Sequence, residues 1–477
     1  MKLPRLIARN LRRRPLTTAL TSFSVALGVG LFAAIGALRH GAEQGFQRSA
    51  SLCDMVVGAK GSSLQLVLNS LYHVGTSPGN VPFSLYEEIS GTTGVLWSVP
   101  MAVGDSYAGS RIVAVTDDLF EALEIPDYGK LRLASGNAFA FSKEALVELH
   151  HELEEHHHEE DEEAEEHHEH HEHHEHHEHH EHEESEESGT EEEEHHAHDE
   201  ELHHLIEEHQ GLFVAVVGSE AAAASGLQVG SRFTPAHDVS GGAGQEQHEE
   251  AETEVVGVLE PTGTPLDRAI FIPLGAFYLI EGHQPTEESE FGGARDPLGL
   301  SSILVRSKPG FYSLSLWRSW NNRLDAQAAR PADEIRNLFQ VVGNVDAILR
   351  LVAALVVVVA LIGVLVAIYN TMGARRKEFA LLRALGAHRA TVLTMVMGES
   401  AAIAAIGALI GMLLAGAGVW VASGKVHSMV GVAVTVLPGW DEIQLLLAVT
   451  AVGAIAGLVP AWNAYRTEAA HHLSGQL

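Results

Sequence analysis

The sequence lacks most of the features that would make this chain an enzyme or a disulfide-stabilised protein. Its single cysteine, Cys53, cannot form an intrachain disulfide. A nucleotide-binding P-loop needs Gly-Lys followed by Ser or Thr, whereas Gly129-Lys130 and Gly424-Lys425 are followed by Leu and Val. No Ser/His/Asp or paired-carboxylate arrangement stands out from the background. We therefore expect no nucleotide site, no intrinsic cofactor and no catalytic activity in this chain.

Basic residues are absent from one segment, His150–Gln210, which consists almost entirely of histidine and acid. It holds 22 of the 31 histidines and 28 Asp or Glu, with no Lys or Arg. The net charge of the whole chain is -33, so this His/Glu tract accounts for most of the acidity. Because the tract has no apolar periodicity, it cannot bury a core, and we predict a disordered insertion.

The tract has the composition of a metal-binding segment. Neutral imidazole is a preferred ligand for zinc, copper and nickel, and carboxylates neutralise a bound cation. In a helical conformation His170, His173, His174 and His177 would share one face. The alternative is a solvated acidic spacer whose histidines bind metal only incidentally. The candidate ligands for Zn²⁺ or another divalent transition metal are His156, His157, His158, His167, His168, His170, His171, His173, His174, His176, His177, His179, His180 and His182.

Four apolar stretches are long enough to cross a bilayer, which needs about 20 mostly apolar residues. We predict spans at 15–38, 348–369, 393–422 and 443–460. The first is longer than the apolar part of a secretory signal and is predicted to be an uncleaved anchor. Spans three and four contain the pairs Gly407/Gly411 and Gly453/Gly457, which allow close helix approach; ordinary intramolecular packing is the favoured interpretation.

The distribution of basic residues sets the topology. Six Lys or Arg precede the first span, and five lie in the loop 370–392, whereas the loop 423–442 has only Lys425. By the positive-inside rule, residues 1–14, 370–392 and 461–477 are cytoplasmic. Residues 39–347 then form a large external domain, in the periplasm of a two-membrane bacterium, and the loop 423–442 is external too.

The external domain has a mixed pattern outside the tract. Short β-branched segments predict strands, and four apolar-periodic segments predict helices, the last of them continuing into the second span. A second polar loop, His237–Glu252, contains His237 and His248; it either shares metal with the tract or is a plain hairpin loop. The fold class is therefore a membrane protein with four transmembrane α-helices and an α+β extracytoplasmic domain between the first two. The predicted strands are 111–116, 212–218, 253–260, 269–274 and 301–306, and the predicted helices are 84–90, 219–227, 274–282 and 331–351.

Several segments together resemble the MacB/FtsX-like ABC transporter permeases. The loop NTMGARRKEFALLRALGA (370–387) resembles the family's cytoplasmic signature, although no acid precedes its arginine pair. PAWNAYR (460–466), VVGSEAAAASGLQVGSRF (216–233) and ARNLRRRPLTTALT (8–21) resemble further family motifs. Val56–Pro82 and Glu260–His283 are similar to a subgroup with His-rich periplasmic insertions that is linked to zinc handling.

This resemblance implies a role for the loop after the second span. In similar permeases a short amphipathic helix, here Arg375–Leu385, docks on a separate ATPase that binds and hydrolyses ATP. The alternative is a topology signal and nothing more. The candidate coupling residues are Arg375, Arg376, Lys377, Glu378, Phe379, Leu382, Arg383, Ala384, Leu385 and Gly386.

The predicted function is the membrane subunit of a MacB/FtsX-like ABC complex in the bacterial inner membrane. We expect a homodimer with a cytoplasmic ABC ATPase, no nucleic-acid partner, and periplasmic work involving zinc or another divalent metal. A periplasmic metal-binding or lipoprotein partner is a further expectation. Two alternatives stay open: extraction or export of a lipid, lipoprotein or peptide with a metal-responsive accessory loop, and a regulatory scaffold of the FtsX type.

Overall fold

The computed structural model of the chain describes residues 3–153, 209–237, 251–280, 298–384, 388–430, 440–460 and 462. The chain divides into two compact units. The helical unit comprises Met1–Gly45, Leu338–Met429 and Ala433–Leu477, and the α/β unit comprises Phe46–Asn337 with Val430–Val432. Each is described by itself below.

Among the described residues, four helices are long and apolar enough to cross a membrane. The candidate spans lie within Pro15–Ala50, Pro331–Asn370, Ala390–Lys425 and Glu442–Pro460. A short basic helix precedes them and ends at Arg13, because Pro15 has no amide hydrogen and begins the next helix. The helices are α1 (Leu3–Arg13), α2 (Pro15–Ala50), α11 (Pro331–Ala384), α12 (Arg389–Val430) and α13 (Trp440–Ala456).

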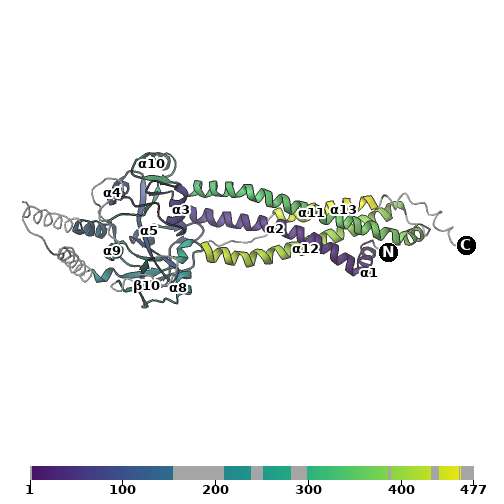
Figure 1. The fold of residues 1–477 in the computed structure, drawn as a ribbon, viewed down its shortest axis with the longest axis horizontal. Helices are drawn as coiled ribbons and strands as arrows, with labels where there is room; N and C mark the ends of the chain where they lie inside the picture. The colour runs from purple at the N-terminus through teal and green to yellow at the C-terminus, as the bar shows by residue number, and fades with distance from the viewer. Residues whose placement is uncertain are drawn as a thin grey trace, which may run out of the picture. The chain divides into compact units, whose positions relative to one another are not determined.

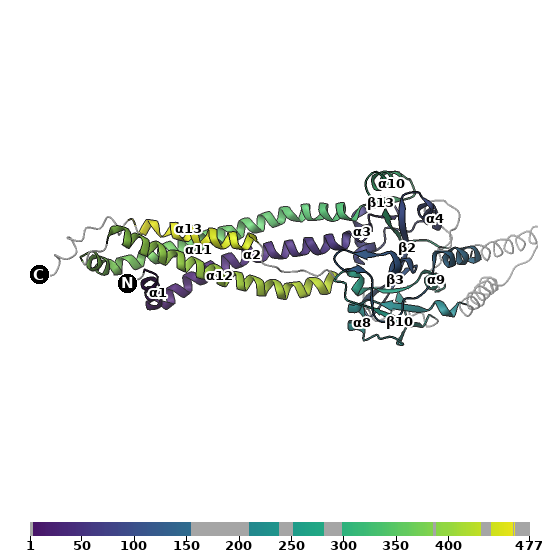
Figure 2. The same cartoon turned by 180° about the vertical axis from the view of Figure 1, so that it is seen from behind.

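Glycines bring these helices into close contact. Figures 1 and 2 show α2, α11 and α12 running side by side. A Cβ added to Gly407 of α12 would lie 2.6 Å from the carbonyl oxygen of Ser22 in α2, and Gly411 meets α2 in the same way. Gly453 of α13 faces Ala404 of α12. The small-residue pairs therefore serve intramolecular packing, as the sequence analysis favoured.

The α/β unit is built on one mixed sheet with the strand order β13-β1-β12-β2-β3-β11-β7-β10-β6. Neighbours pair antiparallel except β3 with β11 and β7 with β10. The strands are β1 (Met55–Gly58), β2 (Val95–Tyr107), β3 (Ser110–Val115), β6 (Leu133–Gly136), β7 (Val214–Val217), β10 (Thr253–Leu259), β11 (Ile270–Pro273), β12 (Ser302–Ser307) and β13 (Gln327–Ala329). Short additional strands are β4 (Glu124–Ile125), β5 (Gly129–Lys130), β8 (Arg232–Phe233) and β9 (Ala236–His237).

Short helices accompany the sheet, among them a helix over 143–153. Trp317 of α10 donates from Nε1 to the carbonyl of Ala328 in β13 at 2.8 Å, which fixes α10 against that strand. The helices are α3 (Ser63–Tyr72), α4 (Phe83–Gly91), α5 (Asp118–Ala122), α8 (Ser219–Ser225), α9 (Leu274–Tyr278) and α10 (Phe311–Asn321), with 3-10 turns at Gln210–Leu212 and Pro265–Arg268.

The predicted elements are largely confirmed. All five predicted strands are present as β3, β7, β10, β11 and β12, and the helix predicted at 331–351 does continue into the second span as part of α11. The helix predicted at 274–282 is shorter, because α9 ends at Tyr278. The longest strand, β2, was not predicted, since Pro100 and Gly104 interrupt its apolar pattern.

Candidate functional site

Helices α2 and α11 connect to neighbouring strands of the sheet. Helix α2 ends at Ala50, just before β1, and α11 begins at Pro331, just after β13. Strands β1 and β13 pair antiparallel with Val56 opposite Ala329 and Gly58 opposite Gln327. Because the start of β1 lies beside the end of β13, both helices join the sheet at one place.

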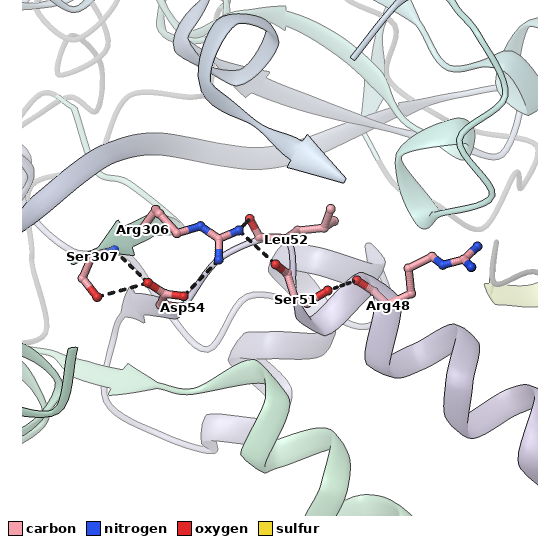
Figure 3. Close-up of polar contacts among 6 residues, drawn as sticks. All are labelled: Arg48, Ser51, Leu52, Asp54, Arg306 and Ser307. Carbon is pink, nitrogen blue, oxygen red and sulfur yellow. Dashed lines mark hydrogen bonds and ion pairs between the residues drawn. The ribbon is translucent and has the colours of Figure 1, made fainter. Parts of the chain in front are cut away.

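A polar network fixes the end of α2 to the sheet. Asp54 accepts hydrogen bonds from Arg306 Nη1 at 3.0 Å and from the amide and hydroxyl of Ser307 at 2.8 and 3.1 Å. Arg306 Nη2 donates to the carbonyls of Ser51 and Leu52 at 2.9 and 2.8 Å (Figure 3). The guanidinium therefore caps carbonyls that the end of a helix leaves without partners, and it does so from strand β12.

Further contacts secure the same junction. The Tyr72 hydroxyl donates to the carbonyl of Phe46 in α2 at 2.6 Å, and the two rings stack with centroids 4.9 Å apart. Burial raises the pKa of Tyr72 above its usual range, so the hydroxyl keeps its proton. Gln327 donates from Nε2 to the carbonyl of Ala59 at 2.9 Å, which ties β13 to the residue that follows β1.

Cys53 lies in this junction and is buried. Burial raises the pKa of its thiol to about 12, and the Arg306 guanidinium opposes that shift only in part. A thiol that stays protonated is a poor nucleophile and a poor metal ligand. Cys53 is therefore a packing residue of the junction.

In the helical unit, a buried carboxylate links α2 to α11. Asp346 of α11 pairs with Arg39 of α2 at 2.6 Å and with Arg350, one turn further along α11, at 2.9 Å. The Asp346 side chain is 6% exposed, whereas the two arginines are 32% and 39% exposed. Sequence reasoning missed this cluster, although an Asp and an Arg beside a long apolar segment were a usable signal.

The candidate coupling segment belongs to the end of α11. The prediction of a separate short helix at Arg375–Leu385 is wrong. Helix α11 is continuous from Pro331 to Ala384 and includes the backbone of Arg375–Ala384. No proline interrupts this segment, and its residues are mostly good helix formers. Leu385 and Gly386 lie outside the described residues.

All the candidate metal ligands, His156 through His182, lie outside the described residues. The chain on either side of them is described. His209 Nε2 lies 3.4 Å from a carboxylate oxygen of Glu152, so the described segments that flank the tract meet. Within the described ranges, no group of three or more His, Cys, Asp or Glu is arranged to hold a metal ion. In the second polar loop, His237 sits opposite Asp105 in the β2–β9 pair.

Part of the helical unit matches a known family. Residues 350–469 match the family described as FtsX-like permease C-terminal. This part of the chain is therefore similar to the C-terminal region of FtsX-like permeases. The resemblance drawn from the loop at 370–387 is thereby confirmed.

The periplasmic region of MacB from Actinobacillus actinomycetemcomitans is 10% identical and has a TM-score of 0.29, over 60% of this chain and 92% of that one. The curated proteins contain no match.

Proposed function

We propose that this permease is the force-transmitting subunit of an inner-membrane ABC complex, present as two copies with two ATPase subunits. Motion of the ATPases would act on Arg375–Gly386 and reach the external α/β unit through α11 and α2. The observation that carries the proposal is the attachment of both helices to one pair of hydrogen-bonded strands, β1 and β13.

Helix α11 has the length that this role needs. Its 54 residues correspond to about 81 Å at 1.5 Å per residue, whereas a bilayer core is about 30 Å thick. One helix therefore contains the basic segment at one end and the residue that follows β13 at the other. The Asp346 pairs to Arg39 and Arg350 would make α2 move together with α11.

The orientation follows from charge. The basic residues of 1–14 and of 370–392 favour the cytoplasmic side by the positive-inside rule, which puts the α/β unit outside. An ATPase docked at the basic segment is then on the side where ATP is available.

The test measures whether ATP moves the α/β unit. The chain is purified with its ATPase in nanodiscs and spin-labelled at Leu324→Cys, a position that is 93% exposed. Cys53 stays unlabelled because its buried thiol keeps its proton. We expect the distance between labels on two copies to change when ATP is trapped with vanadate. An unchanged distance between the two labels would contradict the proposal.

Two variants locate the path of the motion. A Gly-Gly-Ser insertion after Arg330, between β13 and α11, should abolish the distance change and leave ATP hydrolysis intact. The same insertion at Gly109, in the turn between β2 and β3, is the matched control and should leave both readouts unchanged. Arg383→Glu should remove the stimulation of the ATPase by the permease.

The His/Glu tract supports a second element of function, the capture of zinc or a similar divalent metal outside the membrane. Support comes from its 22 histidines and 28 acids and from the Glu152–His209 contact, which brings the two flanks of the insertion together. The metal affinity of such a tract should fall as the pH is lowered, because protons compete for imidazole.

Replacing residues 154–208 with a Gly/Ser linker tests the metal element and keeps the Glu152–His209 pair. We expect the variant to fold and insert, to lose high-capacity zinc binding in calorimetry, and to grow poorly under chelation. Normal growth under chelation combined with an envelope defect would instead favour the hypothesis that the complex extracts or exports a lipid or lipoprotein.

A further inference from the structure

Helix α1 is amphipathic and strongly basic. Its outward-facing side carries Arg5, Arg9, Arg12 and Arg13, which all lie within one eleven-residue helix. The first acidic residue of the chain is Glu43. Such a helix is typical of segments that lie along a membrane surface and attract anionic lipids.

Helix α1 is held on the rest of the helical unit. Asn10 donates from Nδ2 to Oε1 of Glu399 in α12 at 2.6 Å, and Glu399 is only 7% exposed. Ile7 covers Gly398, where an added Cβ would lie 2.6 Å from the Ile7 side chain. Leu6 and Leu11 pack against the apolar core of the unit. The position of the arginines relative to α2 and α12 is therefore fixed by tertiary contacts.

A groove lies between α1, the start of α2 and α12. Its volume is about 680 Å³, within the ~300–1,000 Å³ typical of small-molecule sites. Leu16, Leu20, Phe23 and Ile406 make its walls apolar, and Arg12 is part of its lining. Leu16 and Leu20 are 83% and 67% exposed, so the protein's own side chains do not fill it.

An apolar groove in a membrane can hold a second copy of the chain or a lipid, and the charge beside the groove favours one of them. A second copy related by a two-fold axis would bring another basic α1 with it, and the like charges would repel. A phospholipid supplies an acyl chain for the apolar walls and a phosphate for the guanidinium. The basic residues of 1–14 favour the cytoplasmic leaflet, which is rich in anionic lipid.

We propose that this groove binds one acyl chain of an anionic phospholipid, whose phosphate pairs with Arg12. The site would anchor the amphipathic helix that precedes the first span. The groove includes none of the residues that connect α11 to the sheet. The lipid proposal is therefore tested independently of the proposed force transmission.

The experiment crosslinks the groove in native membranes. A photoreactive phenylalanine analogue replaces Leu20 in the full-length chain, and the adduct is identified by intact mass and by lipid headgroup analysis. Leu27 is the matched control, because it is 53% exposed on the same helix and is not part of the groove lining. We expect the Leu20 adducts to be enriched in phosphatidylglycerol or cardiolipin, and the Leu27 adducts to mirror the bulk membrane.

The charge contact is tested by Arg12→Gln combined with the Leu20 probe. Since one basic residue near a membrane surface contributes about 1 kcal/mol, the enrichment should fall about fivefold. Arg5→Gln makes the same change of net charge on the same helix, outside the groove lining, and should leave the enrichment in place. Equal headgroup composition at Leu20 and Leu27 would overturn the proposal. A chain-to-chain adduct at Leu20 would also overturn it and would assign the groove to a second copy.

Discussion

The two units hold their elements together by opposite means. In the helical unit, Gly407 and Gly411 of α12 meet the backbone of α2, and Gly453 of α13 meets the small side chain of Ala404 in α12. In the α/β unit, the end of α2 is fixed by Asp54, Arg306 and Ser307 through charged hydrogen bonds. A helix in lipid satisfies its own backbone and gains most from close packing, whereas a helix end leaves carbonyls that need donors.

This difference explains why the few buried polar groups of the helical unit are informative. Asp346 and Glu399 each link helices distant in the sequence, α11 to α2 and α12 to α1. Polar groups in such surroundings are costly unless they are paired, so their presence points to a defined arrangement of the helices. Substitutions in each unit test how far that unit depends on its own kind of contact.

The largest effect is expected from Gly411→Leu, because a Cβ there would lie 2.5 Å from the backbone oxygen of Ala26. Backbone cannot yield as a side chain can, so α2 and α12 must separate, at a cost of about 3 kcal/mol. Thermal unfolding in detergent measures the loss. Gly416→Leu is the control, since nothing lies within 4 Å of its added Cβ, and equal losses for the two variants would contradict close packing at Gly411.

Asp54→Ala should cost about 2 kcal/mol, because Arg306 and Ser307 lose a charged acceptor in a half-buried site. The matched control is Asp325→Ala, whose partner Arg323 lies at the surface of the same unit and whose loss should cost less than about 1 kcal/mol. Chemical denaturation monitored by tryptophan fluorescence compares them. A cost for Asp54→Ala no larger than the control would show that the junction does not depend on this network.

Asp346→Asn should lower stability by about 1–2 kcal/mol, less than a fully buried pair would, because the two arginines are about one-third exposed. Asp333→Asn is the control on the same helix, since Asp333 also pairs with two arginines but is 37% exposed. We further expect Asp346→Asn to reduce the ATP-driven distance change at Leu324. If Asp346→Asn keeps the full distance change at Leu324, the Asp346 pairs contribute to stability but not to the transmission of motion.

The smallest effect is a dependence of the α/β unit on pH. Burial lowers the pKa of His73 to about 3, and both ring nitrogens are enclosed without a hydrogen-bond partner. The unfolded chain takes up a proton near pH 6.5 while the folded chain does not, so stability is full above pH 6.5 and declines as the pH falls toward 3. At pH 5.5 the loss should be about 1 kcal/mol.

His73→Gln checks this assignment, because the variant has no group that titrates at that position. The measurement is the free energy of unfolding at pH 8 and pH 5.5 for both proteins in the tract-replaced background. The free energy of unfolding should change less between pH 8 and pH 5.5 in His73→Gln than in the unsubstituted protein. An identical pH dependence in both would show that His73 does not carry the effect.

Much of the fold was predictable from local patterns. The four apolar helices follow from length and composition, and five strands follow from short β-branched segments such as Ile270–Pro273. The similarity to FtsX-like permeases followed from the loop at 370–387, since a charged segment between two spans has a distinctive sequence. Strand β2 was not predicted, because its pairing with β12 and β3 outweighs the weak local preference of Pro100 and Gly104.

The sequence by itself determined the positions of the apolar helices, the location of the acidic tract and the resemblance to FtsX-like permeases, because each depends on residues close together in the chain. Only the tertiary structure decided that β13 lies beside β1, that Arg306 reaches Asp54, and that Arg39 pairs with Asp346. These partners are separated by more than 250 residues, and their contact depends on how whole helices and strands pack. The proposed path of force and the lipid groove both rest on such contacts.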